Sequence, residues 1–230
     1  MSRFWAEPVR LHLHADACEL LGQRLPLDAG AQPWPAALTE HLPPRAKVRA
    51  CLADHWLRYL VVRWPAAVRG KREREAWLAH QFKTVHGIDP AEWTVAMDAD
   101  PVDDARLVCA APAALIAGLH ARLAPRKARL TSLTGAFVAE FNRVRRQCAA
   151  RDGALLVQAG GRMTLGVWRD GQWGALRSQR VADGDAEAAR RVLAQWRVTG
   201  EAAPAGVAYA VGARPALPEG WQLVALEAAA

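Results

Sequence analysis

The chain has 230 residues, of which 52% are hydrophobic and 23% are charged. This composition is that of a globular protein and excludes disordered, collagen-like and coiled-coil chains, while the length fits one domain or two small lobes. The formal net charge of +7 permits an acidic partner, such as nucleic acid, an anionic membrane surface or an acidic protein, without selecting among them.

The apolar segments and the cysteines indicate where the protein works. The longest apolar run, Cys109–Leu119, is far shorter than the ~20 residues that cross a bilayer. No continuous apolar segment follows Met1–Glu7, so we expect no signal peptide. Four cysteines are widely spaced, form no CxxC pair and are expected to be buried free thiols: Cys18, Cys51, Cys109 and Cys148. We therefore expect a soluble, cytoplasmic protein, which something else would have to hold at a membrane if it works there.

Strands and helices alternate along the first half of the chain. Alternating apolar and polar residues predict a strand over 9–14 and, after a tight turn, a second over 18–25. Further strands are expected over 47–53, 58–64, 93–97, 106–110 and 128–133. Helices are expected over 36–41, 71–86 and 112–123. The second of these helices has a predicted inner face of Trp77, Leu78, Gln81, Phe82 and Val85, with Gly87 as its C-cap.

The pattern restarts after a predicted linking helix over 135–150. Strands are expected over 154–159, 162–168, 173–181, 206–212 and 221–226, with a helix over 185–197. A Pro- and Gly-rich connection joins the last two strands where a helix would fit. The repeated order predicts an α/β protein of two similar lobes, residues 1–134 and 135–230, with mixed sheets flanked by helices.

The predicted hairpin over 155–168 has the form of a loop that wraps a phosphate group. In actin-like ATPases such a hairpin reads Asp-x-Gly-Gly-x-x-Thr, and Gly160, Gly161 and Thr164 keep that spacing. The Asp position holds Gln158, whose neutral amide neither neutralises Mg²⁺ nor acts as a base. The residues leave open an ordinary hairpin, a degenerate phosphate loop and a working one.

Two other turns stand at nucleotide-loop positions. Asp16 lies in the first hairpin, where no glycine follows before Gly22, and Gly212 is the only glycine where a pair would meet adenosine. We predict a degenerate nucleotide cleft of Asp16, Gln158, Gly160, Gly161, Thr164 and Gly212. His12, His14 and Asp16 alternate along one strand, but without a further strong ligand we expect an ordinary exposed face and no metal.

Two stretches resemble a known family. The stretch Val48–Pro65, a strand, a turn and a strand ending in Trp-Pro, precedes the Glu- and Ala-containing helix Glu73–Phe82. This order, with the Gly-Gly hairpin, resembles the cytoplasmic actin-like domains of the type II secretion protein GspL and the type IV pilus protein PilM. The resemblance implies a two-lobed actin-like (ribonuclease H-like) fold and a platform that binds membrane assembly partners.

The leading hypothesis is a non-catalytic scaffold of a type IV pilus or type II secretion-like assembly, without a cofactor. Its partner would be the cytoplasmic segment of an inner-membrane assembly protein. The alternative is an ATPase that binds ATP with Mg²⁺ in the same cleft. A second alternative is a basic nucleic-acid-binding module, for which Arg143, Arg145, Arg146 and Arg151 form a candidate face. Whether the chain forms a homodimer is left open.

Overall fold

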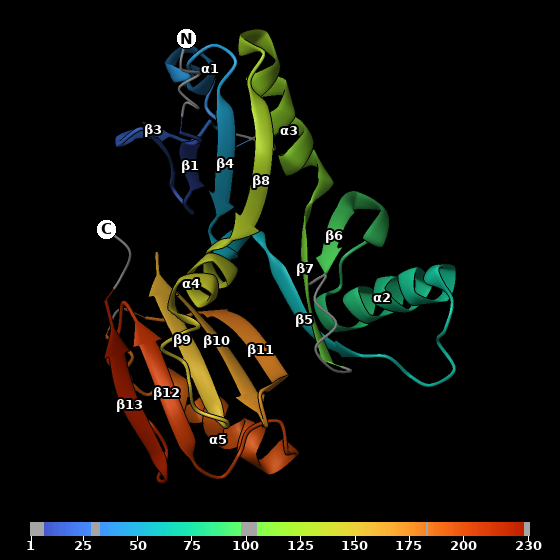
Figure 1. The fold of residues 1–230 in the computed structure, drawn as a ribbon, viewed down its shortest axis with the longest axis vertical. Helices are drawn as coiled ribbons and strands as arrows, with labels where there is room; N and C mark the ends of the chain where they lie inside the picture. The colour runs from blue at the N-terminus through green and yellow to red at the C-terminus, as the bar shows by residue number, and fades with distance from the viewer. Residues whose placement is uncertain (1–6, 29–32, 98–104, 183, 228–230) are drawn as a thin grey trace, which may run out of the picture. The chain divides into compact units, whose positions relative to one another are not determined.

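A computed structural model describes residues 7–28, 33–97, 105–182 and 184–227 (Figure 1). Contacts group these residues into two compact units. The first unit contains the residues up to 57 together with 91–94 and 111–139, and the second contains 58–90, 95–110 and the residues from 140 onward. The predicted lobe boundary at residues 134 and 135 stays a prediction, and the N-terminal stretch 1–6 lies outside the described residues.

The first unit is built on a five-stranded sheet in the order β3-β2-β1-β4-β8. Its strands are β1 (Val9–Leu13), β2 (Ala17–Leu20), β3 (Gln23–Pro26), β4 (Lys47–Leu52) and β8 (Arg129–Gly135). The central strand β1 pairs antiparallel with β2 and parallel with β4, which pairs parallel with β8. The single strand predicted over 18–25 is wrong, because Leu21 (φ 52°) and Gly22 (φ 77°) turn the chain back between β2 and β3.

Two helices of the first unit lie beside each other, α1 (Ala37–His41) and α3 (Ala113–Leu123). The fully buried Trp34 donates its indole N–H to the carbonyl oxygen of Leu115 at 2.7 Å. The Thr39 hydroxyl donates to the carbonyl oxygen of Arg122 at 3.0 Å. These bonds connect the segment before β4 to the helix before β8. A third helix, α4 (Ala136–Val144), ends earlier than the predicted 135–150, and a hydrogen-bonded turn follows it.

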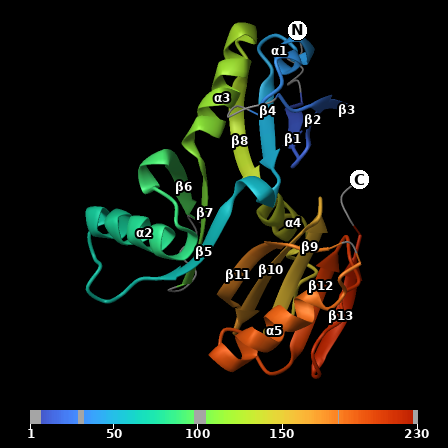
Figure 2. The same ribbon diagram turned by 180° about the vertical axis from the view of Figure 1, so that it is seen from behind.

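The second unit repeats this topology with the order β11-β10-β9-β12-β13. Its strands are β9 (Gly153–Ala159), β10 (Arg162–Arg169), β11 (Gln172–Arg180), β12 (Gly206–Val211) and β13 (Trp221–Leu226). The central β9 is antiparallel to β10 and parallel to β12, as β1 is to β2 and β4. Helix α5 (Ala188–Thr199) covers one face, where Val192, Leu193 and Trp196 join the apolar core of β9, β10 and β12 (Figure 2). The connection between β12 and β13 contains no helix, as the sequence predicts.

A three-stranded sheet in the order β5-β7-β6 also belongs largely to the second unit. Its strands are β5 (Arg58–Arg63), β6 (Trp93–Met97) and β7 (Ala105–Pro112). Helix α2 (Lys71–His86) lies between β5 and β6 in the sequence. Helix α2 ends as predicted at Gly87, which has a φ of 65° and donates its N–H to Lys83. Leu78 and Phe82 are buried, but the prediction that Val85 is buried is wrong, since its side chain is 57% exposed. Only a narrow face of α2 is covered.

The tryptophan and cysteine side chains are buried to different degrees. Four tryptophans expected in the core are buried: Trp34, Trp168, Trp196 and Trp221. Five others are half-buried: Trp56, Trp64, Trp77, Trp93 and Trp173. All four cysteines are free, but only Cys18 is buried as predicted. Among the described residues, no helix combines the length and the apolar character needed to cross a membrane.

Burial raises the pKa of the Cys18 thiol to about 12, so almost none of it is the reactive thiolate near neutral pH. We expect iodoacetamide at pH 8 to leave Cys18 unmodified in the folded protein and to modify it fully in urea. Peptide mass spectrometry measures the labelling, and the half-buried Cys51 and Cys109 are internal comparisons. Labelling of folded Cys18 as fast as that of Cys51 would contradict the burial of β2.

Candidate functional site

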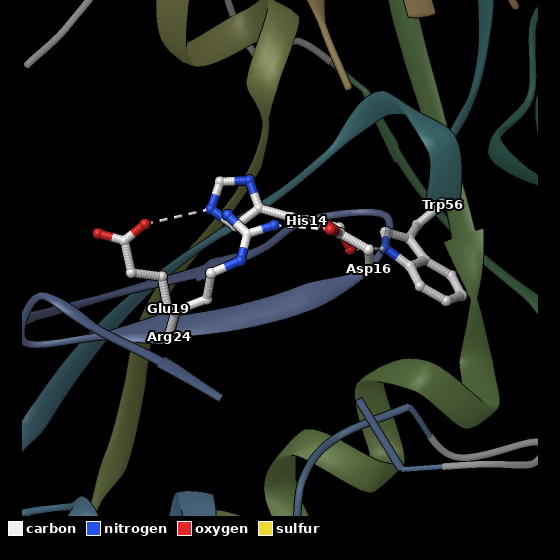
Figure 3. Close-up of polar contacts among 5 residues, drawn as sticks. All are labelled: His14, Asp16, Glu19, Arg24 and Trp56. Carbon is white, nitrogen blue, oxygen red and sulfur yellow. Dashed lines mark hydrogen bonds and ion pairs between the residues drawn. The ribbon is translucent and has the colours of Figure 1, made fainter. Parts of the chain in front are cut away.

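The first candidate loop is the turn between β1 and β2, shown in Figure 3. The N–H of His14 donates to the carbonyl oxygen of Ala17 at 2.8 Å. The indole N–H of Trp56 donates to the carbonyl oxygen of His14 at 2.9 Å. None of residues 14–17 has a positive φ, whereas backbone nests that hold anions use left-handed residues. This turn is therefore a closed hairpin, and its backbone forms no such nest.

The side chains of Asp16 and His14 in this turn have partners on the neighbouring strands β3 and β2. Arg24 on β3 donates to the Asp16 carboxylate at 2.6 Å, and both side chains are exposed. The His14 ring and the Glu19 carboxylate lie 3.3 Å apart (Figure 3). Exposed ion pairs contribute at most ~1 kcal/mol, so this pairing orients Asp16 toward Arg24 without fixing it there.

A buried carboxylate that the sequence analysis missed lies at the end of β4. Asp54 begins the 3-10 helix Asp54–Trp56 and is only 7% exposed. One of its oxygens accepts the backbone N–H of Phe137, in the first turn of α4, at 3.1 Å. This bond joins the turn after β4 to the first turn of α4. Asp54 thus positions α4 against the end of the sheet.

The second candidate loop, between β9 and β10, keeps the predicted glycine turn. Gly160 and Gly161 have φ values of 56° and 67°, and Ala159 pairs directly with Arg162. Two consecutive left-handed residues between paired strands are typical of a type I′ hairpin, which most side chains disfavour. The turn itself therefore favours glycine, although Leu21 and Asp170 adopt the same left-handed conformation at the first position of the other two-residue hairpin turns.

The side chain of Thr164, on strand β10 of the second unit, is buried. It is 1% exposed, and its hydroxyl donates to the Ser178 hydroxyl on the neighbouring β11 at 2.9 Å. Arg162 also donates to that Ser178 oxygen, at 3.2 Å. A buried hydroxyl needs such a partner, because an unsatisfied one costs roughly 1–3 kcal/mol. The structure thus gives Thr164 a role inside the sheet.

Gln158 and Gly212 meet at the carboxyl ends of the parallel strands β9 and β12. A Cβ atom at Gly212, where φ is 76°, would lie 2.4 Å from the carbonyl oxygen of Gln158. Both residues line a hollow of about 190 Å³ with Asp185 and Arg214 among its walls. Pockets for small molecules usually hold roughly 300–1,000 Å³, so this hollow is smaller than a typical ligand site.

Among the described residues that line this hollow, the one carboxylate belongs to Asp185 and is already paired. Asp185 accepts a hydrogen bond from Arg191 at 2.6 Å, and this bond lowers the pKa of Asp185 below its usual value. In the described part of the chain, no three or more His, Cys, Asp or Glu residues are placed to hold a metal ion. Within the second unit, the predicted residues Gln158 and Gly212 are thus brought together, and the side chain that Gln158 brings there is a neutral amide. Asp16 belongs to the first unit, and its part in a nucleotide cleft stays a prediction.

No family model matches the chain, and no curated protein matches it. Solved structures do match the chain. A Bacteroides thetaiotaomicron protein with an actin-like ATPase fold and unknown function shares 10% identity at a TM-score of 0.58, over 90% of this chain and 82% of its own. A PilM–PilN type IV pilus biogenesis complex matches with 16% identity and a TM-score of 0.60, over 89% and 81%. The cytoplasmic domain of EpsL, an inner-membrane component of the Vibrio cholerae type II secretion system, matches with 13% and 0.55, over 96% and 90%.

These likenesses confirm the predicted α/β actin-like fold. Each of the two units contains a five-stranded sheet with the same arrangement of strands, so the sheet is duplicated within the chain. At such identities the comparison establishes the fold, and the chemistry has to be argued from this chain's own residues.

Replacing Asp54 with Ala removes a buried acceptor and leaves the Phe137 N–H with one partner fewer. We expect Asp54→Ala to lower the free energy of unfolding by about 1–3 kcal/mol. Asp16→Ala, at an exposed carboxylate, is the matched control and is expected to cost no more than about 0.5 kcal/mol. Urea unfolding measures both, and equal stabilities would contradict the structural role of Asp54.

Proposed function

We propose that the protein is a non-catalytic cytoplasmic scaffold of a type IV pilus or type II secretion-like assembly. In this role it binds the cytoplasmic segment of an inner-membrane protein and reaches the membrane through that partner. The observation that carries the proposal is Gln158, which occupies the acidic position of the phosphate hairpin within an actin-like fold.

The surroundings of Gln158 support a site without hydrolytic chemistry. Activation of water and binding of Mg²⁺ call for a carboxylate near the phosphate. Asp185, the acid among the described residues that line the hollow, is paired with Arg191. The buried hydroxyl of Thr164 donates a hydrogen bond to the hydroxyl of Ser178. Among the described residues that line the hollow, Gln158 is a neutral amide, Asp185 is paired, and Arg214 is a cation that neither binds Mg²⁺ nor acts as a base.

The proposed partner class follows from the similar structures. One of them is a complex of PilM with PilN, and another is the cytoplasmic domain of an inner-membrane secretion component. A scaffold in either setting has to recognise a short segment that emerges from the membrane. Extended segments are recognised by backbone pairing at a sheet edge or by a groove with side-chain pockets.

The scaffold proposal predicts that nucleotide does not bind. Mg-ATP at about one hundred times its dissociation constant would stabilise the folded state by about 2.7 kcal/mol. We therefore expect no change in Tm with millimolar Mg-ATP, and no heat in a calorimetric titration. Sub-millimolar affinity would overturn the claim of a non-functional site. Phosphate release that is lost in Asp16→Ala would instead support the ATPase alternative.

The partner is tested with a detergent extract of inner membranes from the organism that encodes the chain. We expect cross-linking and mass spectrometry to identify an inner-membrane assembly protein, and a synthetic peptide of its cytoplasmic segment to compete for binding. Retention on heparin or DNA that falls steeply with salt would favour the nucleic-acid alternative. Failure of the peptide to compete would contradict the proposed mode of binding.

A further inference from the structure

The two faces of the first sheet differ in character along its neighbouring strands β1, β4 and β8 (Figure 1). Alternate residues of β1 and β4 are apolar and buried, as Leu11, Val48 and Ala50 are. Successive residues of a strand point to opposite faces, so the residues between them lie on the other, exposed face. Six exposed cations lie on that face and in the turns where β4 and β8 begin, and together they form the basic face: Arg10, Arg45, Lys47, Arg49, Lys127 and Arg129.

The register of the strands places like charges side by side on the basic face. Arg10 on β1 is the direct partner of Arg49 on β4, and Lys47 on β4 is the direct partner of Arg129 on β8. Neighbouring strands lie about 4.8 Å apart, and like charges directly opposite each other are destabilising. Arg10, Arg49 and Arg129 form no ion pair with another described residue, including the exposed Glu7 just before β1. No described acid therefore offsets the repulsion among these arginines.

Two basic turns extend the basic face at the amino ends of β4 and β8. Arg45 and Lys127 have φ values of 57° and 53°, in the left-handed region that is uncommon for residues other than glycine. The N–H of Arg45 donates to the carbonyl oxygen of Arg126 at 2.8 Å, so the two turns lie beside each other. The Arg126 side chain serves the fold, because it donates to the carbonyl oxygens of Thr39 and Glu40. The exposed side chains of Arg45 and Lys127 extend the positive charge beyond the strands.

The arrangement of these cations selects among anionic partners. They lie on three adjacent strands and at more than one position along β4, so they form a two-dimensional array instead of a line. An extended peptide adds to a free sheet edge, but β4 is paired with β1 on one side and with β8 on the other.

Nucleic acid fits this array less well than a flat anionic surface does. Single strands stack their bases on aromatic side chains, and β1, β4 and β8 contain no Phe, Tyr or Trp. The grooves of duplex DNA admit a helix or a two-stranded ribbon, which the middle of a sheet does not provide. A layer of lipid headgroups is itself two-dimensional, and the arginine fork binds phosphate through two parallel N–H bonds.

We propose that the basic face binds the anionic headgroups of a lipid bilayer. The cytoplasmic leaflet of a cell membrane has a negative surface potential, and each Lys or Arg near it favours binding by a factor of roughly five. The attachment is electrostatic, so it weakens as salt screens the charges. It adds a direct contact with the membrane to the protein partner proposed above, and it does not depend on the scaffold function.

Co-sedimentation of the full chain with lipid vesicles tests this proposal. We expect binding to vesicles of one part phosphatidylglycerol and two parts phosphatidylcholine, and none to phosphatidylcholine alone. Salt at about 1 M, where the Debye length is about 3 Å, should release the protein. The double variant Arg49→Glu/Arg129→Glu should bind at least about tenfold more weakly. The matched control is Arg72→Glu/Arg146→Glu, which changes the net charge equally at two exposed arginines outside the basic face and should leave binding unchanged.

Urea unfolding of the same double variant separates lipid binding from a role in the fold. Each substitution places a carboxylate beside a cation, Arg10 or Lys47, so the double variant should unfold at a higher urea concentration than the unchanged chain. Lower stability would contradict the repulsion from which the proposal is argued. Equal binding to both kinds of vesicle, or binding that survives the double variant, would overturn the proposal. Tighter binding of duplex DNA or polyglutamate than of vesicles, at equal negative charge, would overturn the lipid as occupant.

Discussion

The position of every candidate site residue depends on how one central strand is paired in each unit. Strand β1 has an antiparallel hairpin partner on one side and a parallel partner on the other, and β9 has the same pair of neighbours. The hairpin turn and the end of the parallel strand must then meet at one edge of the sheet. The N–H of Ala53 accordingly donates to the carbonyl oxygen of Leu13 at 2.8 Å, where β4 ends beside the first turn. Gly212 approaches Gln158 in the corresponding place.

The two units use this shared meeting point differently. In the first, a buried acid and an indole stabilise it, since Asp54 accepts from Phe137 and Trp56 donates to His14. In the second, close backbone approach replaces side chains, because Gly212 leaves no room for a Cβ atom. Both solutions use local groups to hold the sheet edge together.

Local sequence patterns predicted most of the fold, because alternation and glycine turns act over a few residues. The three strands β9, β10 and β11 and the helix α2 lie where they were expected. The break between β2 and β3 was missed because Leu21 adopts a left-handed conformation, which is uncommon for residues other than glycine and which leucine does not predict. Asp54 was missed because its partner Phe137 lies 83 residues along the chain. Only the parallel pairing of β4 and β8 brings such distant segments together.

The retained glycines do not by themselves indicate a nucleotide. The left-handed turn between β9 and β10 favours glycine at Gly160 and Gly161, and a Cβ at Gly212 would collide with the backbone of Gln158. The fold itself therefore accounts for these glycines, with or without a ligand. The side chains carry the chemical information, and at the hairpin they are a neutral amide and a hydroxyl bound to Ser178.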